Sequence, residues 1–139
     1  MAVSAYAERP SEFPTEKTMT IRKILVVDDS PTERLALSEI LTRNGYEVVT
    51  AESGEDAISK SCSELPDLIL MDVVMPGMNG YQATRTISRA ETTRGIPIIM
   101  CTSKGLETDK IWGMRQGAYD YIVKPLDFTA LLARIKSIG

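Results

Sequence analysis

Three aspartates directly follow two apolar runs of the sequence, and they are the residues most suited to chemistry. The run 24–27 ends in Asp28 and Asp29, and the run 68–71 ends in Asp72. Carboxylates gathered at strand ends repel one another, so such a site is unfavourable unless a cation or a proton offsets the charge. Mg²⁺ suits it, because this ion binds carboxylates, keeps several waters and commonly acts with phosphate. The sequence therefore predicts a Mg²⁺ site at which Mn²⁺ can substitute.

Length, composition and charge favour one compact domain that binds other proteins. The 139 residues are 43% hydrophobic and 25% charged, within the usual range for a globular domain. The formal net charge of -3 implies no broad basic face that would attract nucleic acid. The sequence has neither an apolar stretch of membrane-spanning length nor a secretory signal, so we expect a cytoplasmic protein without membrane insertion.

The histidine and cysteine content excludes several kinds of catalytic and metal-binding site. The chain contains no histidine, which excludes histidine-based triads, histidine metal sites and a phosphohistidine donor. Cys62 and Cys101 do not have the spacing of a metal or redox motif, and Cys101 lies in an apolar run where a buried, inert thiol is expected. We therefore expect no disulfide.

Five strand-like runs alternate with segments of helical spacing, which predicts an α/β fold with a parallel sheet and helices on both faces. Strands are expected at about 23–28, 46–50, 67–71, 97–101 and 120–123. Helices are expected at about 31–44, 54–64, 80–90, 104–116 and 128–138. Ser30, Ser53 and Asp127 are suited to cap three of these helices, and Glu33, three residues after Ser30, gives the pattern of a capping box.

Polar residues follow four of the five predicted strands. Thr102 and Ser103 follow the fourth strand and Lys124 follows the fifth, in addition to the aspartates after the first and third. In an open parallel sheet, ligands bind beyond the carboxyl ends of the strands, where the winding direction reverses. An edge position for the second strand, as in the strand order 2-1-3-4-5, would explain why that strand contributes nothing. Three carboxylates, a hydroxyl and an ammonium group are then expected at one cleft.

These residues lie in four segments that together resemble the CheY-like receiver domain of bacterial response regulators in two-component systems. The segments are 24–30 (ILVVDDS), 71–80 (MDVVMPGMNG), 102–103 (TS) and 121–125 (YIVKP). The resemblance covers about 21–139. It implies a flavodoxin-like, doubly wound sheet of five parallel strands in the order 2-1-3-4-5, flanked by five helices.

The resemblance implies that Asp72 is the phosphoacceptor. Its carboxylate would attack the phosphoryl group of a phosphohistidine on a sensor histidine kinase. Asp29, Asp72 and the backbone carbonyl of Val74 would bind Mg²⁺, and Asp28 would assist through a water molecule. On this interpretation the chain is a signalling domain and not an enzyme acting on other substrates.

The resemblance also implies how phosphorylation is reported. Lys124, aimed by a cis peptide bond to Pro125, would hold one phosphoryl oxygen, and the hydroxyl of Thr102 would donate to another. The movement of Thr102 would give Tyr121 room to turn inward. A downstream protein would then bind the face formed by the fourth helix, the fifth strand and the fifth helix, with the chain a monomer or a weak dimer.

A finer resemblance lies largely outside this site. The segments 29–33, 82–85 and 107–118 are similar to PilH-type receivers of the chemotaxis-like system that controls type IV pili and twitching motility. This similarity implies a CheA-like kinase as the phosphoryl donor.

Other functions remain open on the sequence alone. A Mg²⁺-dependent phosphatase of the haloacid dehalogenase type also uses an aspartate nucleophile, but it has a second Asp where this chain has Val74. A purely structural receiver-like module would have lost the acceptor or the lysine. A phosphorelay intermediate or a phosphate sink would use the same residues as a stand-alone effector.

Three further expectations concern residues around these motifs. Residues 1–20 show no strand or helix periodicity and are interpreted as a flexible tail before the receiver domain at 21–139. Trp112, at helical spacing with its neighbours, is expected to pack on the sheet. Val74 is expected beside the phosphoryl group, where it cannot orient a hydrolytic water and so prolongs the phosphoryl lifetime, and Lys104 is expected over the phosphate.

Overall fold

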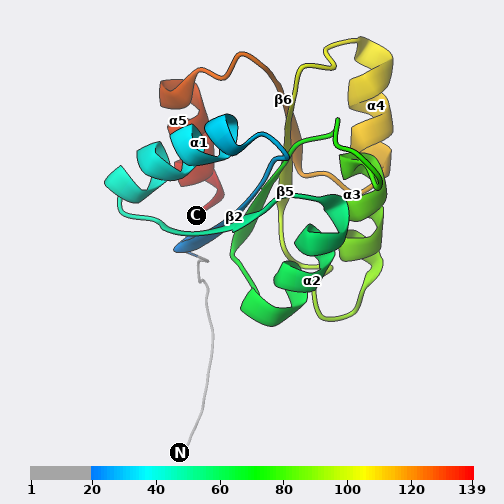
Figure 1. The fold of residues 1–139 in the computed structure, drawn as a ribbon, viewed down its shortest axis with the longest axis horizontal. Helices are drawn as coiled ribbons and strands as arrows, with labels where there is room; N and C mark the ends of the chain where they lie inside the picture. The colour runs from blue at the N-terminus through cyan, green and yellow to red at the C-terminus, as the bar shows by residue number, and fades with distance from the viewer. Residues whose placement is uncertain (1–19) are drawn as a thin grey trace, which may run out of the picture.

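The computed structural model describes residues 20–139, which form one five-stranded sheet flanked by five helices (Figure 1). The strands are β2 (Lys23–Val27), β3 (Glu47–Ala51), β4 (Leu68–Met71), β5 (Ile98–Thr102) and β6 (Asp120–Val123). The helices are α1 (Pro31–Arg43), α2 (Gly54–Glu64), α3 (Gly80–Arg89), α4 (Glu107–Arg115) and α5 (Phe128–Ile138). The tail expected over 1–20 lies, apart from its last residue, outside the described residues.

All strand pairs are parallel, and their order is β3-β2-β4-β5-β6. This is the order 2-1-3-4-5 in chain sequence, so the predicted topology is confirmed. The register pairs Val27 of β2 with Met71 of β4, and Thr102 of β5 with Val123 of β6. The residues that follow these strands therefore meet at one edge of the sheet, while β3 lies at the outer side.

Helices cover both faces of the sheet, because alternate strand residues point to opposite sides. Figure 1 shows α1 and α5 on one side of the sheet and α2, α3 and α4 on the other. Ile24 and Val26 of β2 pack in the core with α1 and α5, whereas Leu25 and Val27 pack in the core with α2 and α3. Every residue of β4 is buried, as expected for a strand covered on both faces.

The predicted helix caps are confirmed at three starts, and a fourth was missed. Ser30, Ser53 and Asp127 each accept a hydrogen bond from the main-chain amide three residues later. At the start of α3, Asn79 forms a reciprocal capping box with Gln82. Glu33 does not complete the box predicted at α1, because its carboxylate contacts Lys124 instead.

The expectation that Trp112 packs on the sheet was wrong. Trp112 and its neighbours Ile111 and Met114 are each about half exposed, and Gly113 is the buried residue of α4. A Cβ atom at Gly113 would lie 2.9 Å from Met100 Sδ and from the ring of Tyr121. Since α4 approaches the sheet this closely, a larger residue at position 113 would require Met100 or Tyr121 to move, and the larger side chains of α4 face outward.

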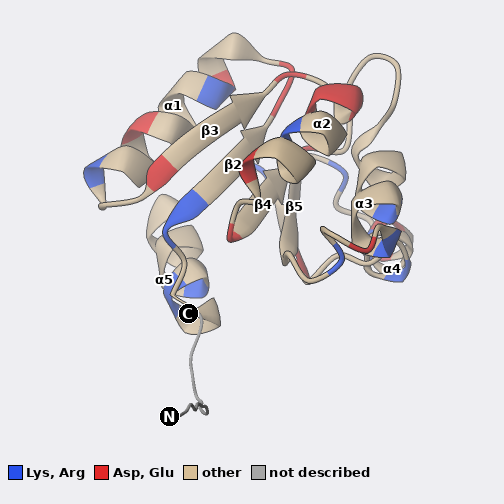
Figure 2. Ribbon diagram, turned by 90° about the horizontal axis from the view of Figure 1, so that it is seen from below, with Lys and Arg blue, Asp and Glu red and all other residues tan. Residues whose placement is uncertain are grey.

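The distribution of charged residues and the hydropathy of the helices are those of a domain with the composition given above. Figure 2 shows both charge signs on α1, α2 and α4, whereas α3 and α5 carry lysine or arginine without aspartate or glutamate. Within residues 20–139, none of the helices has both the length and the apolar character needed to cross a bilayer.

Candidate functional site

A cavity of about 720 Å³ opens at the carboxyl ends of β2, β4 and β6. Its polar wall contains Asp28, Asp29, Asp72 and Lys124, and it extends between the start of α1 and the segment that joins β6 to α5. Val74 also lines it, with 56% of its surface exposed. The structure therefore brings together residues that lie up to 96 positions apart in the chain.

The three aspartates form a set of oxygens suited to a hard divalent cation. One carboxylate oxygen of each residue lies within 4.8 Å of the others, with Asp28 and Asp72 buried and Asp29 exposed. Asp28 is held by two hydrogen bonds, since its Oδ1 accepts from Ser30 N at 2.9 Å and its main-chain carbonyl oxygen accepts from the Arg34 guanidinium at 2.7 Å. Mg²⁺ prefers few carboxylates together with several waters, so an open site with three carboxylates fits it.

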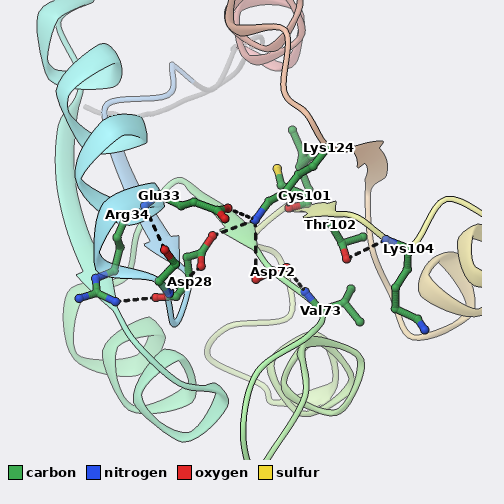
Figure 3. Close-up of polar contacts among 11 residues, drawn as sticks. Asp28, Glu33, Arg34, Asp72, Val73, Cys101, Thr102, Lys104 and Lys124 are labelled. Carbon is green, nitrogen blue, oxygen red and sulfur yellow. Dashed lines mark hydrogen bonds and ion pairs between the residues drawn. The ribbon is translucent and has the colours of Figure 1, made fainter.

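The ammonium group of Lys124 lies among carboxylates (Figure 3). Its Nζ is 3.0 Å from Asp28 Oδ2 and 3.7 Å from Asp72 Oδ2, and it also pairs with Glu33. The main-chain amide of Lys124 donates to the carbonyl of Thr102 at 2.8 Å, which continues the pairing of β6 with β5. The peptide bond from Lys124 to Pro125 is cis, as the resemblance implied.

Burial and charge shift the protonation of the two central groups. Burial raises the pKa of Asp72 to about 6, because Lys124 only partly offsets the desolvation and Asp28 adds repulsion. Burial tends to lower the pKa of Lys124, but its hydrogen bonds with Glu33 and Asp28 and the charge of Asp72 hold that pKa above its usual range. Lys124 is therefore cationic, and Asp72 ionises more readily when a cation is near.

Thr102 lies at the end of β5 but does not line the cavity. It is fully buried, and its Oγ1 accepts a hydrogen bond from Lys104 N at 3.3 Å. Ser103 and Cys101 form the adjacent part of the cavity wall. Cys101 is buried, as expected from its apolar run.

Tyr121 already points inward in this structure. Its hydroxyl donates to the carbonyl of Lys104 at 2.7 Å and lies 3.3 Å from the hydroxyl of Tyr81. The ring packs against Gly113 of α4, where a side chain would overlap it. The inward position expected to follow a movement of Thr102 is thus held by contacts with α3, α4 and the β5–α4 segment.

The expectation that Lys104 lies over the phosphate was wrong. Lys104 Nζ pairs with Asp109 Oδ1 at 3.8 Å at the start of α4, and Lys104 is not among the residues that line the cavity. The acidic residue in the first turn of the helix holds the ammonium group away from the aspartates.

Two residues important for the site were not singled out from the sequence. Glu33 contacts Lys124, but its position three residues after Ser30 indicated a capping box. Gly80 starts α3 so close to β4 that a Cβ atom there would overlap the carbonyl of Asp72 and lie 2.8 Å from the Cα of Val73. The Asn-Gly pair at 79–80 was the available signal, since such pairs mark turns and helix starts.

Comparison with known proteins defines the class of this fold and site. Residues 24–136 match the response regulator receiver domain family. The chain belongs to this family, and its strand order and flanking helices are those of the CheY-like fold. The chemotaxis protein CheY4 of Vibrio cholerae has a similar structure, with a TM-score of 0.81 at 32% identity over 86% of this chain and 100% of that chain.

Two further proteins are similar in sequence or in site. The chain is 49% identical to the protein PilH of Pseudomonas aeruginosa over 116 residues, which are 84% of this chain and 96% of PilH. The receiver domain of the sensor histidine kinase PA1611 from the same species has a TM-score of 0.78 at 31% identity, covering 86% of this chain and 98% of that chain. In that receiver, a magnesium ion is coordinated in the active site cleft.

Proposed function

We propose that Asp72 accepts a phosphoryl group from a phosphohistidine on a sensor histidine kinase. The observation that carries this proposal is the position of the Asp72 carboxylate in an open cavity, with two further carboxylates within 4.8 Å and the Lys124 ammonium at 3.7 Å. A carboxylate oxygen of Asp72 forms the new bond to phosphorus while the bond from phosphorus to the imidazole nitrogen breaks. The product is an aspartyl phosphate.

Asp29, Asp72 and the carbonyl oxygen of Val74 would hold Mg²⁺ directly, and Asp28 would hold it through a water molecule. When bound, the ion supplies positive charge that neutralises the phosphoryl oxygens during in-line transfer. The acidic cluster supports this assignment, as does the magnesium ion in the cleft of the similar PA1611 receiver.

Lys124 would supply the remaining positive charge by binding one phosphoryl oxygen, and Thr102 would donate its hydroxyl to another. Thr102 and Tyr121 would then act together as the switch. The main chain of Lys104 supports this coupling, because its amide donates to Thr102 Oγ1 and its carbonyl oxygen accepts from the Tyr121 hydroxyl. A movement of Thr102 towards a phosphoryl group would therefore displace the acceptor of the Tyr121 hydroxyl.

The output surface would be the face of α4, β6 and α5, recognised by a downstream protein. Exposed apolar side chains support this choice, because they lie on or next to these elements and suit a protein partner. They are Ile111, Trp112, Met114, Tyr119, Val123 and Phe128. The similarity to PilH supports a role in a chemotaxis-like system for type IV pili and twitching motility, with a CheA-like kinase as the donor. The chain would act in the cytoplasm as a phosphoacceptor and not as an enzyme on other substrates.

The proposal is tested by incubating the protein with Mg²⁺ and acetyl phosphate and measuring its intact mass. The wild type is expected to gain one phosphoryl group, and the Asp72→Asn variant is expected to gain none, because its amide is not a nucleophile. Beryllofluoride, a phosphoryl mimic, is expected to bind the wild type only when Mg²⁺ is present. Equal modification of wild type and variant would exclude Asp72 as the acceptor.

A further inference from the structure

We propose that Glu33 is a positioning residue that holds Lys124 away from Asp72 until a phosphoryl group arrives. This inference rests on the proposed function of Asp72 and Lys124. The first turn of α1 then restrains the site, because the contact of Glu33 with Lys124 competes with the binding of a phosphoryl oxygen by the same ammonium group.

The geometry of the Lys124 ammonium is the first reason. Its Nζ forms hydrogen bonds with Asp28 Oδ2 at 3.0 Å and with Glu33 Oε1, whereas Asp72 Oδ2 is 3.7 Å away, beyond hydrogen-bond distance. Figure 3 shows the Lys124 side chain with its ammonium between Glu33, Asp28 and Asp72. In this state Lys124 is therefore hydrogen-bonded to Asp28 and Glu33 and forms only a longer ion pair with Asp72.

The carboxylate of Glu33 has no other contact among the described residues that would explain its position. The cap of α1 uses the side chain of Ser30 and the main-chain amide of Glu33, at 3.3 Å, and leaves the Glu33 carboxylate free. The amide of Ser30, which a capping-box glutamate would bind, donates instead to Asp28 Oδ1. Glu33 lines the cavity as a fourth acidic residue, and its side chain is 54% exposed at the rim.

The negative charge of Glu33 is expected to weaken the binding of a phosphoryl group at Asp72. A phosphoryl group on Asp72 adds negative charge and needs a cationic hydrogen-bond donor, so it competes with Glu33 for the same ammonium. Glu33 also repels the arriving anion. Replacing Glu33 by glutamine removes its negative charge, so the repulsion is lost and the contact with Lys124 is reduced to a weaker, neutral acceptor. Because a partly exposed ion pair contributes up to ~1 kcal/mol, the expected gain in affinity for a phosphoryl mimic is about twofold to fivefold.

The affinity for Mg²⁺ alone, without a phosphoryl mimic, is expected not to increase in the Glu33→Gln variant. Loss of one negative charge near the aspartates weakens their attraction for a divalent cation, and a Lys124 released towards Asp72 competes with that cation. The Glu33→Gln variant is therefore expected to bind beryllofluoride more tightly at saturating Mg²⁺, but to bind Mg²⁺ alone no more tightly than the wild type. A merely structural role of Glu33 would not move these two affinities apart.

The test measures both affinities by calorimetry on four proteins: wild type, Glu33→Gln, Glu33→Asp and Glu39→Gln. Glu39 is an exposed glutamate of the same helix that does not line the cavity, so its replacement controls for net charge and for α1. Glu33→Asp keeps the charge but shortens the reach to Lys124, so it is expected to bind the mimic more tightly than the wild type, by less than Glu33→Gln does. Glu39→Gln is expected to resemble the wild type.

The outcomes separate this inference from the proposed function. If the wild type fails to bind beryllofluoride with Mg²⁺, the function assigned to Asp72 fails, and the role of Glu33 with it. If the wild type binds it and Glu33→Gln binds no more tightly, only the role of Glu33 is overturned. If Glu33→Asp behaves like the wild type, or Glu39→Gln behaves like Glu33→Gln, the effect comes from general charge and the contact with Lys124 is not the cause.

Discussion

Asp72 and Lys124 show how position sets the chemistry of an ordinary residue. Each follows a strand, and each acquires its properties from neighbours that come from other elements. Asp72 is buried beside Asp28, which raises its pKa to about 6, and Lys124 lies 3.7 Å from it. A carboxylate whose ionised form is disfavoured by burial is stabilised when a metal ion binds beside it. The pair therefore suits a site whose charge state changes during signalling.

At the same scale, Val74 is predicted to control the lifetime of an aspartyl phosphate. Its apolar side chain lines the cavity and cannot orient a hydrolytic water by hydrogen bonding. The Val74→Asn variant supplies an amide at that place. We expect it to lose its phosphoryl group about fivefold faster, the effect of one hydrogen bond of about 1 kcal/mol. The measurement is the intact mass of phosphorylated protein followed over time after removal of the donor.

Leu65→Asn provides the matched control for this measurement. Leu65 is an exposed apolar residue that does not line the cavity, and its φ of 45° is one that asparagine adopts readily. Its replacement is expected to leave the decay rate unchanged. An unchanged or slower decay in Val74→Asn would disprove the role of Val74.

At the scale of elements, two close approaches of helices to the sheet shape the site and its output face. The start of α3 abuts the end of β4 at Gly80, and α4 abuts β5 and β6 at Gly113. The first contact fixes the segment after Asp72, where Gly80 N also donates to the carbonyl of Val73 at 2.9 Å. The second leaves room for the inward ring of Tyr121 and turns the larger residues of α4 outward. At Gly80 a side chain would overlap the main chain of Asp72, and at Gly113 a side chain would require Met100 or Tyr121 to move.

Gly80→Ala is therefore predicted to destabilise the domain. The new methyl group would overlap the main chain of Asp72, which cannot move without disturbing β4, and such overpacking costs about 1–3 kcal/mol. Urea denaturation should show a lower midpoint at an unchanged slope. Gly95→Ala is the control, because a Cβ atom at Gly95 meets nothing within 4 Å and its effect should stay within about 0.5 kcal/mol. Equal midpoints for the two variants would contradict the close packing of α3 on β4.

At the scale of the whole molecule, the parallel sheet concentrates acidic groups at one edge. The burial of Asp72 and its repulsion by Asp28 and Asp29 lower the free energy of unfolding when Asp72 is ionised. The expected result is a free energy of unfolding that depends on pH through Asp72. Because the folded protein holds the Asp72 proton up to a pKa of about 6, against an ordinary pKa of 3.8 in the unfolded chain, it binds more protons than the unfolded chain between these values. Stability is thus expected to fall as the pH rises from about 4 to about 6.5.

This pH dependence is measured relative to Asp72→Asn, which cannot titrate at that position. We expect the wild type to lose about 1–2 kcal/mol against the variant over this range, less than the full shift implies because water reaches the open side of the cavity. Saturating Mg²⁺ should remove the loss, since a cation that binds only the folded state stabilises it. If the difference in free energy of unfolding between the two proteins stays constant with pH, burial does not raise the pKa of Asp72.

Sequence patterns predicted most of the fold and the main residues of the site. The five strands and five helices lie within a few residues of their expected bounds, except that α4 starts at Glu107 where about 104 was expected. The aspartates and Lys124 were predicted because each follows an apolar run. The errors, at Trp112, Lys104 and Glu33, all concern the direction of a side chain on a correctly predicted element. Helical spacing predicts which residues share one side of a helix, but which side is buried also depends on how the helix packs on the sheet. In α4 the residue against the sheet is Gly113, so Trp112 and its large neighbours are exposed.

The amino-acid sequence by itself determined what is local or periodic: strand and helix lengths, caps, and the placement of polar residues directly after strands. The parallel arrangement then requires those residues to meet at one edge, so the acidic site follows from the same patterns. Only the tertiary structure decided which partners each group finds there. The contact of Lys124 with Glu33 joins residues 91 positions apart, and the inward Tyr121 depends on Tyr81, 40 positions away, and on the approach of α4. Such contacts depend on the packing of whole helices against the sheet, for which the chain carries no local pattern.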